Sequence, residues 1–354
     1  MTPAARVSWG TVLRYLARRL AATVPLVLGT TLVVFVVGRW APGDPVQVLL
    51  GDIGDPVTEA RARAKLGLDR PIVEQYLRFL GRLLHGDLGV SYAYPGMPVR
   101  RLVGEALGPS LLLGGLAVAA AVVLGVPLGL LAALSPRSAL DRLVRALTLT
   151  GIAIPFFVVA VGLVLVFSLR LRWLPVSGWG TPIHLVLPVI VLALRPLAYV
   201  ARITRLALRS VLQEDYVRTA RAKGLGPAAV NLRHALRNAA VTIATTAGLT
   251  LSLALTGAFV TETIFGVPGM GRATVTAILQ RDYPAIQAIV LLYTGLFLAL
   301  NLLTDLGYAL LDPRIRYTTC RPRARWADGP GATGSPPHRS RSCCCSGAGA
   351  RSSR

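Results

Sequence analysis

Few side chains in this 354-residue sequence are placed to make or break covalent bonds. The histidines His85, His184 and His234 are isolated from one another, and no nucleophile–base pair stands out beside them. Neither of the two lysines, Lys65 and Lys223, lies in the G-x-x-x-x-G-K-[ST] motif that binds nucleotide phosphates. We therefore expect no enzymatic activity, no catalytic residue and no cofactor in this chain.

Three charged residues lie within or at the edge of long apolar stretches: Arg195, Glu262 and Asp305. An ionisable group at membrane depth is costly, so each is a candidate for lining or gating a solute pathway. The alternative is a structural role. Arg195 would then extend its side chain to the cytoplasmic interface, and the two carboxylates would form a salt bridge or cap a helix.

The cysteines mark a change in the character of the chain. All four, Cys320, Cys343, Cys344 and Cys345, lie near the C-terminus, so the rest of the chain has no disulfide framework. No spacing of Cys and His typical of a metal site occurs. Residues 318–354 are rich in Arg, Ser, Gly and Pro without an apolar period, which predicts disorder. Our hypothesis is that this tail is a non-native extension.

The composition indicates that a lipid bilayer is the solvent of this protein. Hydrophobic residues make up 53% of the chain and charged residues only 15%, whereas a soluble domain has about 45–50% and about 25%. The net charge of +22 could indicate nucleic-acid binding. The basic residues, however, lie in loops and in the tail, which is typical of cytoplasmic loops and argues against nucleic acid.

Stretches without charged residues predict six membrane spans, since a spanning helix needs about 20 apolar residues. The fourth begins as a loop and must continue through Arg195 and Pro196 to residue 203 to cross. The first is longer than the apolar region of a signal peptide, and we expect it to be retained. The stretches are Leu20–Gly38, Ala106–Pro136, Ala146–Leu169, Trp173–Leu194, Asn238–Thr261 and Tyr283–Thr304.

The distribution of arginine predicts the orientation. The N-terminal segment and the loops after spans two and four are strongly basic, so these sides and both termini should be cytoplasmic. Residues 41–105 balance bases with acids and should lie outside. Val57–Leu66 and Pro71–Leu84 have helical spacing there, the second with an apolar stripe of Val73, Leu77, Leu80 and Leu84. We expect a small helical cap beside the mouth of the pathway.

The loop after span four is too polar to be buried in lipid and too patterned to be a simple linker. It reads QEDYVRTARAKGLGPAAVNLRHALRNAA over residues 213–240. Tyr216–Lys223 should be helical, Gly224 and Gly226–Pro227 should force a turn, and Ala228–Asn238 should form a second helix. Two short helices rimmed with arginine predict a docking surface for another protein. An ordinary basic loop is the alternative.

This loop resembles the EAA loop of ABC importer permeases, in which an acidic-Ala-Ala element is followed after three residues by glycine. Arg218-Thr219-Ala220 stands at the EAA position and Gly224 at the glycine. His234-Ala235-Leu236-Arg237 stands where the general pattern ends in proline. The missing acid and the missing proline are both similar to the dipeptide/oligopeptide/nickel branch of that family.

Seven further motifs resemble the same branch in the same order, so the resemblance covers residues 10–317. They are Ala41–Pro45, Leu66–Pro71, Leu84–Gly89, Glu262–Phe265, Pro268–Arg272, Arg281–Pro284 and Leu311–Tyr317.

The resemblance implies a type I ABC importer permease fold, which is an all-α, six-span protein of the bacterial inner membrane. Residues 1–40 would be the N-terminal segment and first helix, residues 41–105 an external segment, and residues 106–317 a five-helix core. It also implies four kinds of partner: membrane lipid, a second homologous permease subunit, two cytoplasmic ATPase subunits and an extracytoplasmic substrate-binding protein. The substrate would be a peptide or a related small solute.

The resemblance further implies that residues 205–238 couple the chain to the ATPases. A stand-alone secondary transporter or channel is the alternative, but it would need polar residues in several spans and an internal repeat, and neither is evident. The coupling residues implied are Tyr216, Arg218, Thr219, Ala220, Ala222, Lys223, Gly224, His234, Leu236 and Arg237.

Overall fold

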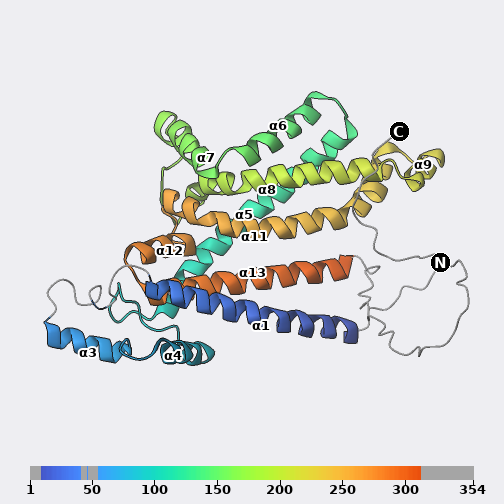
Figure 1. The fold of residues 1–354 in the computed structure, drawn as a ribbon. Coiled ribbons are helices and arrows are strands. Elements are labelled where there is room, and N and C mark those ends of the chain that lie inside the picture. The colour runs from blue at the N-terminus through green and yellow to red at the C-terminus, as the bar shows by residue number, and fades with distance from the viewer. Residues whose placement is uncertain (1–8, 41–45, 47–54, 312–354) are drawn as a thin grey trace, which may run out of the picture. The chain divides into compact units, whose positions relative to one another are not determined.

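The computed structural model describes residues 9–40, 46 and 55–311 (Figure 1). The chain divides into two units, Met1–Ile315 and Arg316–Arg354, and every described residue belongs to the first. The predicted disordered tail with its four cysteines therefore lies outside the described residues, as do the motif at residues 41–45 and all but the first residue of the motif at 311–317.

Helices make up almost all of the described ranges, where the single β-type pairing is an isolated bridge between Val90 and Pro98. The helices are α1 (Trp9–Trp40), α3 (Pro56–Leu66), α4 (Ile72–Leu84), α5 (Val99–Leu134), α6 (Ala139–Ala153), α7 (Phe156–Leu163), the π-helical η2 (Val164–Arg170), α8 (Pro182–Val211), α9 (Asp215–Ala222), α10 (Pro227–Ala229), the π-helical η3 (Val230–Leu236), α11 (Arg237–Phe265), α12 (Met270–Leu279) and α13 (Tyr283–Leu311).

Among the described residues, four helices are long and apolar enough to cross a membrane, and they correspond to the first, second, fourth and sixth predicted spans. α8 runs unbroken through Arg195 and Pro196, as predicted. α5 begins at Val99, seven residues before the predicted start of its span. The four segments are Arg19–Gly38, Val99–Leu134, Pro182–Val211 and Tyr283–Thr304.

The predicted third span is not a straight helix. Its two halves, Ala139–Gly151 and Phe156–Arg170, are bent by 105° and form at most one broken span. Pro155 causes the break, because it has no N–H and because it forces the preceding residue out of the helical conformation. Ile154 accordingly adopts φ −83° and ψ 124°. A search for charge-free stretches passes over this proline.

The predicted fifth span, Asn238–Thr261, lies within α11, a single helix of 29 residues. At about 1.5 Å per residue this helix is about 43 Å long, which exceeds the hydrocarbon thickness of a bilayer. α11 is not one of the four helices counted above, so the total of six crossings stays a prediction.

Among the described helices, α5 and α8 share the most extensive contact, and glycine makes their close approach possible. A Cβ added at Gly125 would lie 3.1 Å from the carbonyl oxygen of Leu197, and one at Gly129 would overlap the carbonyl of Ala201 and the side chain of Thr204. Small residues at such spacing let helix backbones approach where lipid supplies no hydrophobic driving force. The spacing of Gly125 and Gly129 is a sequence signal for such packing, and the structure shows the close approach.

The external segment folds into the two predicted helices and attaches to α12 and α13. Asp282, 1% exposed, precedes α13. Its carboxylate accepts a hydrogen bond from the Ser91 hydroxyl and one from the backbone N–H of Tyr92 at 3.1 Å. The apolar stripe predicted on α4 is mostly exposed, because a different face of α4, centred on Tyr76 and Phe79, packs on α1.

We predict that Gly129→Val separates α5 from α8. Overpacking of this kind costs about 1–3 kcal/mol of the free energy of unfolding. Gly115→Val is the matched control, because a Cβ on that residue of α5 meets no atom within 4 Å. Thermal unfolding of the purified chain in detergent should give a lower melting temperature for Gly129→Val. Equal melting temperatures would show that α5 and α8 are not in close contact.

Candidate functional site

The loop between α8 and α11 is a folded element with its own small core. Val217 and Ala220 of α9 are buried against Val230 of η3, and Val211 and Leu212 at the end of α8 pack beside them. Burial of these side chains fixes the two helices against each other. The predicted helix–turn–helix is therefore present, although Leu232 of η3 is 55% exposed.

Glycine sets the turn between the two helices. Gly224 has φ +76°, a conformation that residues with a side chain rarely adopt. Its N–H donates to the carbonyl oxygen of Arg221 at 3.0 Å. Gly226 has an ordinary φ of −60°, and Pro227 then occupies the first helical position of α10. The turn thus depends on Gly224 far more than on Gly226.

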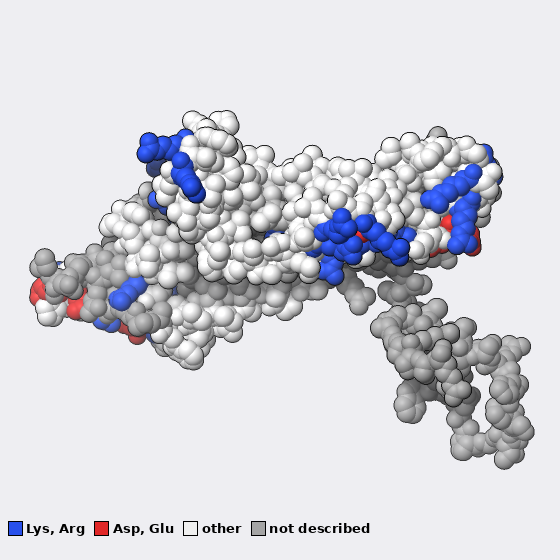
Figure 2. Space-filling view, turned by 90° about the horizontal axis from the view of Figure 1, so that it is seen from above, with Lys and Arg blue, Asp and Glu red and all other residues white. Residues whose placement is uncertain are grey.

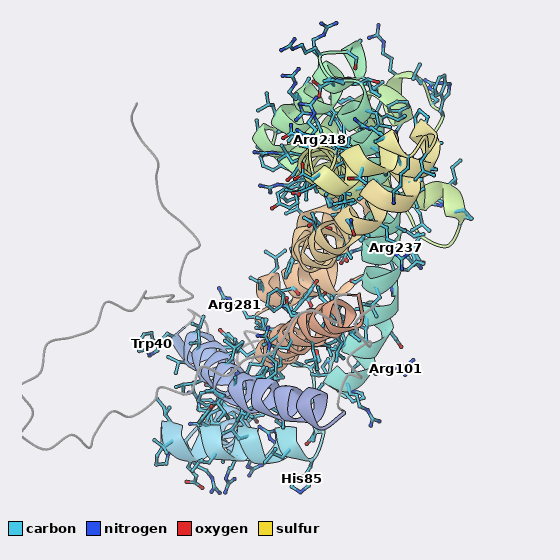
Figure 3. The ribbon with its side chains drawn as sticks, turned by 90° about the vertical axis from the view of Figure 1, so that its right-hand side faces the viewer. Trp40, His85, Arg101, Arg218, Arg237 and Arg281 are labelled. Atoms are coloured by element: carbon cyan, nitrogen blue, oxygen red, sulfur yellow. The ribbon has the colours of Figure 1, made fainter. Side chains whose placement is uncertain are left out.

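Most of the predicted coupling residues lie on the exposed rim of this loop. Tyr216, Arg218, Thr219, Ala222, Lys223, Gly224 and Arg237 are exposed, Leu236 is half-buried and Ala220 is buried. The side chain of His234 lies outside the described part. Figure 2 shows that Lys and Arg gather over this end of the molecule, and Figure 3 shows Arg218 and Arg237 projecting from α9 and from the start of α11.

α9 makes one polar side-chain contact with α11 and one ion pair within itself. The amide of Asn238, in the first turn of α11, donates to the hydroxyl of Tyr216 at 2.6 Å. Arg218 and Asp215 are 3.6 Å apart, but their side chains are 73% and 96% exposed. Exposed ion pairs contribute little to stability. The Tyr216–Asn238 contact therefore fixes α9, and Arg218 is left available at the surface.

The loop continues into α11 without a break. Leu236, between η3 and α11, has helical φ and ψ angles of −64° and −39°. α11 ends at Phe265, and Figure 1 shows α9 and α12 at its opposite ends. A π-helical turn such as η3 interrupts regular α-helical hydrogen bonding and is frequent at functional positions. The loop and α12 are therefore joined by the length of α11.

Glu262, in the last turn of α11, is fully buried and caps the next helix. One carboxylate oxygen accepts from the Ser110 hydroxyl of α5 at 2.6 Å. The other accepts from the backbone N–H groups of Gly271 and Arg272 at 2.7 and 3.2 Å. The Ser110 oxygen in turn accepts from the N–H of Met270 at 2.7 Å. The geometry is that of a helix cap, the structural alternative considered for this residue.

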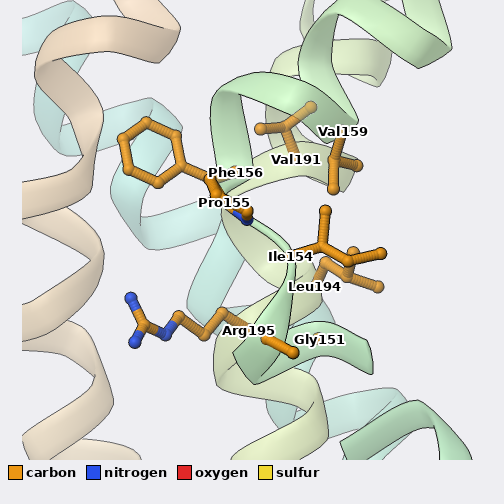
Figure 4. A pocket seen from close by; sticks show the side chains of 9 residues that line it. Gly151, Ile154, Pro155, Phe156, Val159, Val191, Leu194 and Arg195 are labelled. Atoms are coloured by element: carbon orange, nitrogen blue, oxygen red, sulfur yellow. The ribbon is translucent and has the colours of Figure 1, made fainter. Parts of the chain in front are cut away.

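Arg195 lies on the exposed side of α8, beside a cavity of about 280 Å³ at the α6–α7 break. Pro155, Val191 and other apolar side chains line that cavity. Figure 4 shows the guanidinium pointing away from them. Among the described residues, Arg195 has no carboxylate partner. A role in the solute pathway stays a prediction, and so does that of Asp305, whose side chain lies outside the described part.

Sequence reasoning missed Asp141, which is 1% exposed and surrounded by arginines. One carboxylate oxygen lies 2.5 Å from Arg205 Nε and 3.2 Å from Arg209 Nη2. The other lies 3.0 Å from Arg145 Nη2 and accepts from the backbone N–H of Arg137 at 3.2 Å. This group joins α6 to α8 on the side that carries the loop.

One signal in the sequence could have identified that group. Asp141 is the single acidic residue among the bases between spans two and three, Arg137, Arg142 and Arg145. A lone acid in such a run is a natural ion-pair partner, but counting bases to assign orientation hides it. Figure 2 shows the resulting basic patch, with a little acidic surface inside it.

Comparisons with known proteins identify relatives over most of the chain. The family described as binding-protein-dependent transport system inner membrane component matches residues 125–317, and the N-terminal part of such membrane components matches residues 12–98. A probable peptide ABC transporter permease of Sinorhizobium fredii is 39% identical over 86% of this chain and 99% of its own length. A dipeptide transport system permease of Escherichia coli K12 is 38% identical over the same shares.

A solved structure has a similar fold. An inward-facing conformation of the MetNI methionine ABC transporter superposes with a TM-score of 0.53, covering 60% of this chain and 97% of that one at 16% identity. At this identity the likeness establishes the helical fold alone.

We predict that Asp141→Asn destabilises the protein, because it leaves the largely buried Arg205 unpaired. Breaking a buried ion pair lowers the free energy of unfolding by about 3–5 kcal/mol. We expect a loss near the lower end of that range, because Arg145 and Arg209 are partly exposed. Glu105→Gln is the matched control, because it removes the ion pair of Arg101 and Glu105, whose side chains are 68% and 63% exposed. This change should lower the free energy of unfolding by at most about 1 kcal/mol. Thermal unfolding in detergent measures both. An Asp141→Asn protein as stable as the control would contradict this account.

We also predict that Glu262→Ala destabilises the protein even when no partner is present. The change leaves the N–H of Gly271 and the Ser110 hydroxyl without their acceptor, and each buried unsatisfied group costs about 1–3 kcal/mol. Thermal unfolding of the isolated chain tests this effect. Unchanged stability combined with altered transport would indicate a gating role instead of a cap.

Proposed function

Because this chain belongs to the family of inner-membrane components of binding-protein-dependent transport systems, we propose that it forms half of the translocation pathway of an ATP-driven importer of peptides or related small solutes. The relatives named as peptide and dipeptide permeases support this class of substrate. The particular solute is set by a separate substrate-binding protein, which delivers it from outside.

The proposed assembly has a second, homologous permease subunit and two cytoplasmic ATPase subunits. ATP hydrolysis belongs to those ATPases, since this sequence has no phosphate-binding loop. Our proposed topology has six crossings with both termini in the cytoplasm, supported by the distribution of arginine. Arg195 and Asp305 face the pathway in this proposal, and Glu262 positions α12 near its outer end.

One observation carries the proposal: the loop within residues 205–238 is folded, exposed and continuous with α11. Its core of Val217, Ala220 and Val230 keeps its shape, while the rim of polar and basic side chains is free to contact another protein. Docked in an ATPase, the loop follows the opening and closing of that subunit. α11 then carries the movement towards Glu262 and α12. This is rigid-body switching between two states.

We predict that Gly224→Val uncouples transport from ATP hydrolysis. A β-branched residue at φ +76° is strained, by about 1–2 kcal/mol, and a distorted turn misplaces α9. In the assembled complex, ATP hydrolysis stimulated by substrate and binding protein should fall about five- to thirtyfold if that strain opposes docking. Insertion of the chain into the membrane should be unchanged.

Gly226→Ala is the matched control for this experiment. Gly226 has φ −60°, and a Cβ there meets no atom within 4 Å. The variant should keep wild-type stimulation. Normal stimulation in Gly224→Val would refute the coupling role of the loop, whereas equal loss in both variants would show that the effect is not specific to the turn.

A further inference from the structure

α4 contacts α1 at the level of the apolar span. The hydroxyl of Tyr76 lies 2.9 Å from the hydroxyl of Thr31. The ring of Phe35 lies 5.3 Å from the ring of Tyr76 and 6.0 Å from that of Phe79, measured between centroids. Thr31 and Phe35 are 1% and 3% exposed as a result. The Tyr76 hydroxyl also donates to the carbonyl oxygen of Leu28 at 3.3 Å. This external helix is therefore fixed to α1 by the polar contacts of Tyr76 and by an aromatic cluster.

The position of these contacts sets the depth of α4. The apolar segment of α1 ends at Gly38. Phe35 and Thr31 precede it by three and seven residues, which correspond to about 5 and 10 Å along the helix axis. An amphipathic helix lying in a membrane interface buries its apolar face by about 5–10 Å. α4 therefore lies at the depth of an interfacial helix.

α4 also lies across α1, as an interfacial helix should. In Figure 1 α1 runs in the plane of the view while α4 is seen almost along its axis, and in Figure 3, turned by 90°, α4 extends across the bottom of the view and ends beside His85. The contacts with α1 are made by the side chains of Tyr76 and Phe79, one turn apart. α4 is therefore oriented to run along the membrane surface.

The side of α4 next to this contact is an exposed apolar stripe. Val73, Leu77 and Leu84 are 70%, 61% and 87% exposed. Leu32 and Val33 on α1, at the same depth, are 47% and 60% exposed. Both helices therefore expose large apolar side chains near their contact. Such a surface is stable in contact with hydrocarbon, whereas a patch of this kind facing water is unfavourable.

The charged residues of α4 lie beside this stripe, on the side turned away from α1, and compensate one another. Glu74 lies 2.5 Å from Arg70 and 3.2 Å from Arg78. The hydrogen bond from Arg70, with the charges of both arginines, lowers the pKa of Glu74 below its ordinary value. At helical spacing, Arg78 and His85 fall on the same side as Glu74. A polar side bearing cations suits the phosphate layer of a membrane surface.

We propose that α4 is an interfacial helix whose stripe of Val73, Leu77 and Leu84 is immersed in the acyl chains of the outer leaflet, so that lipid is the partner that covers it. Contact with α1 on one side and with lipid on the other holds the external segment at the membrane surface. The proposal does not depend on the transported solute or on the coupling loop.

Spin labels on adjacent residues of α4 test this proposal. The four cysteines at 320, 343, 344 and 345 are first replaced by serine, because labels are then attached to introduced cysteines alone. Leu77→Cys samples the stripe, Arg78→Cys samples the polar side, and Leu32→Cys samples α1. The full-length chain, with the subunits that co-purify with it, is placed in vesicles of phosphatidylethanolamine and phosphatidylglycerol.

The measurement is the collision rate of each label with oxygen, which concentrates in lipid, and with a water-soluble nickel chelate. We expect the oxygen-to-nickel ratio at Leu77 to match that at Leu32 and to exceed that at Arg78. A ratio at Leu77 equal to that at Arg78 would place the stripe in water and overturn the proposal. Protection of the Leu77 label from both reagents would overturn it too, by showing that a protein subunit covers the stripe.

Discussion

The structure depends on the pairing of its buried carboxylates with arginines or hydrogen-bond donors. Asp141, Glu262 and Asp282 are each 1% exposed or less, and a buried charge is costly unless it is paired and hydrogen-bonded. Each therefore fixes the elements around it: Asp141 joins α6 to α8 through arginines, Glu262 joins α5, α11 and α12, and Asp282 joins the external segment to α13. Gly125 and Gly129 let α5 and α8 pack closely, but the three buried carboxylates determine how the ends of the helices are held.

The arrangement gives the coupling loop a mechanical connection. η3 passes directly into α11, and α11 ends in the carboxylate that caps α12. In the proposed mechanism, movement applied to α9 reaches α12 through α11, while Asp141 holds the neighbouring α6 against α8. A membrane component without its own ATPase needs such a connection, since only a physical displacement can carry the free energy of hydrolysis from another subunit.

Much of this architecture can be predicted from the sequence, because hydrophobic length and glycine placement are local signals. The ends of α3 and α4, the unbroken course of α8, the turn at Gly224 and the packing of Gly125–Gly129 all follow from such signals. The break at Pro155 was missed because charge-free length was weighed without asking what the chain does at a proline. Arg137 and Arg145, two partners of Asp141, lie in the same basic run of sequence. Its partner Arg205 and the partners of Asp282 could not be predicted, because they lie about 60 and 190 positions away and depend on tertiary packing. The roles of Arg195 and Asp305 stay predictions for the same reason.

The central claim, that the loop around α9 receives an ATPase, has a direct test. A photo-activated crosslinking amino acid at Thr219, exposed on α9, is introduced into the chain in its native membrane, and the captured proteins are identified by mass spectrometry. Val123, exposed on α5, carries the crosslinker in the control. The account predicts that Thr219, and not Val123, captures a subunit with a nucleotide-binding phosphate loop. If Thr219 captures no such subunit and the chain is recovered alone or only with copies of itself, the energy source is elsewhere and the account is wrong.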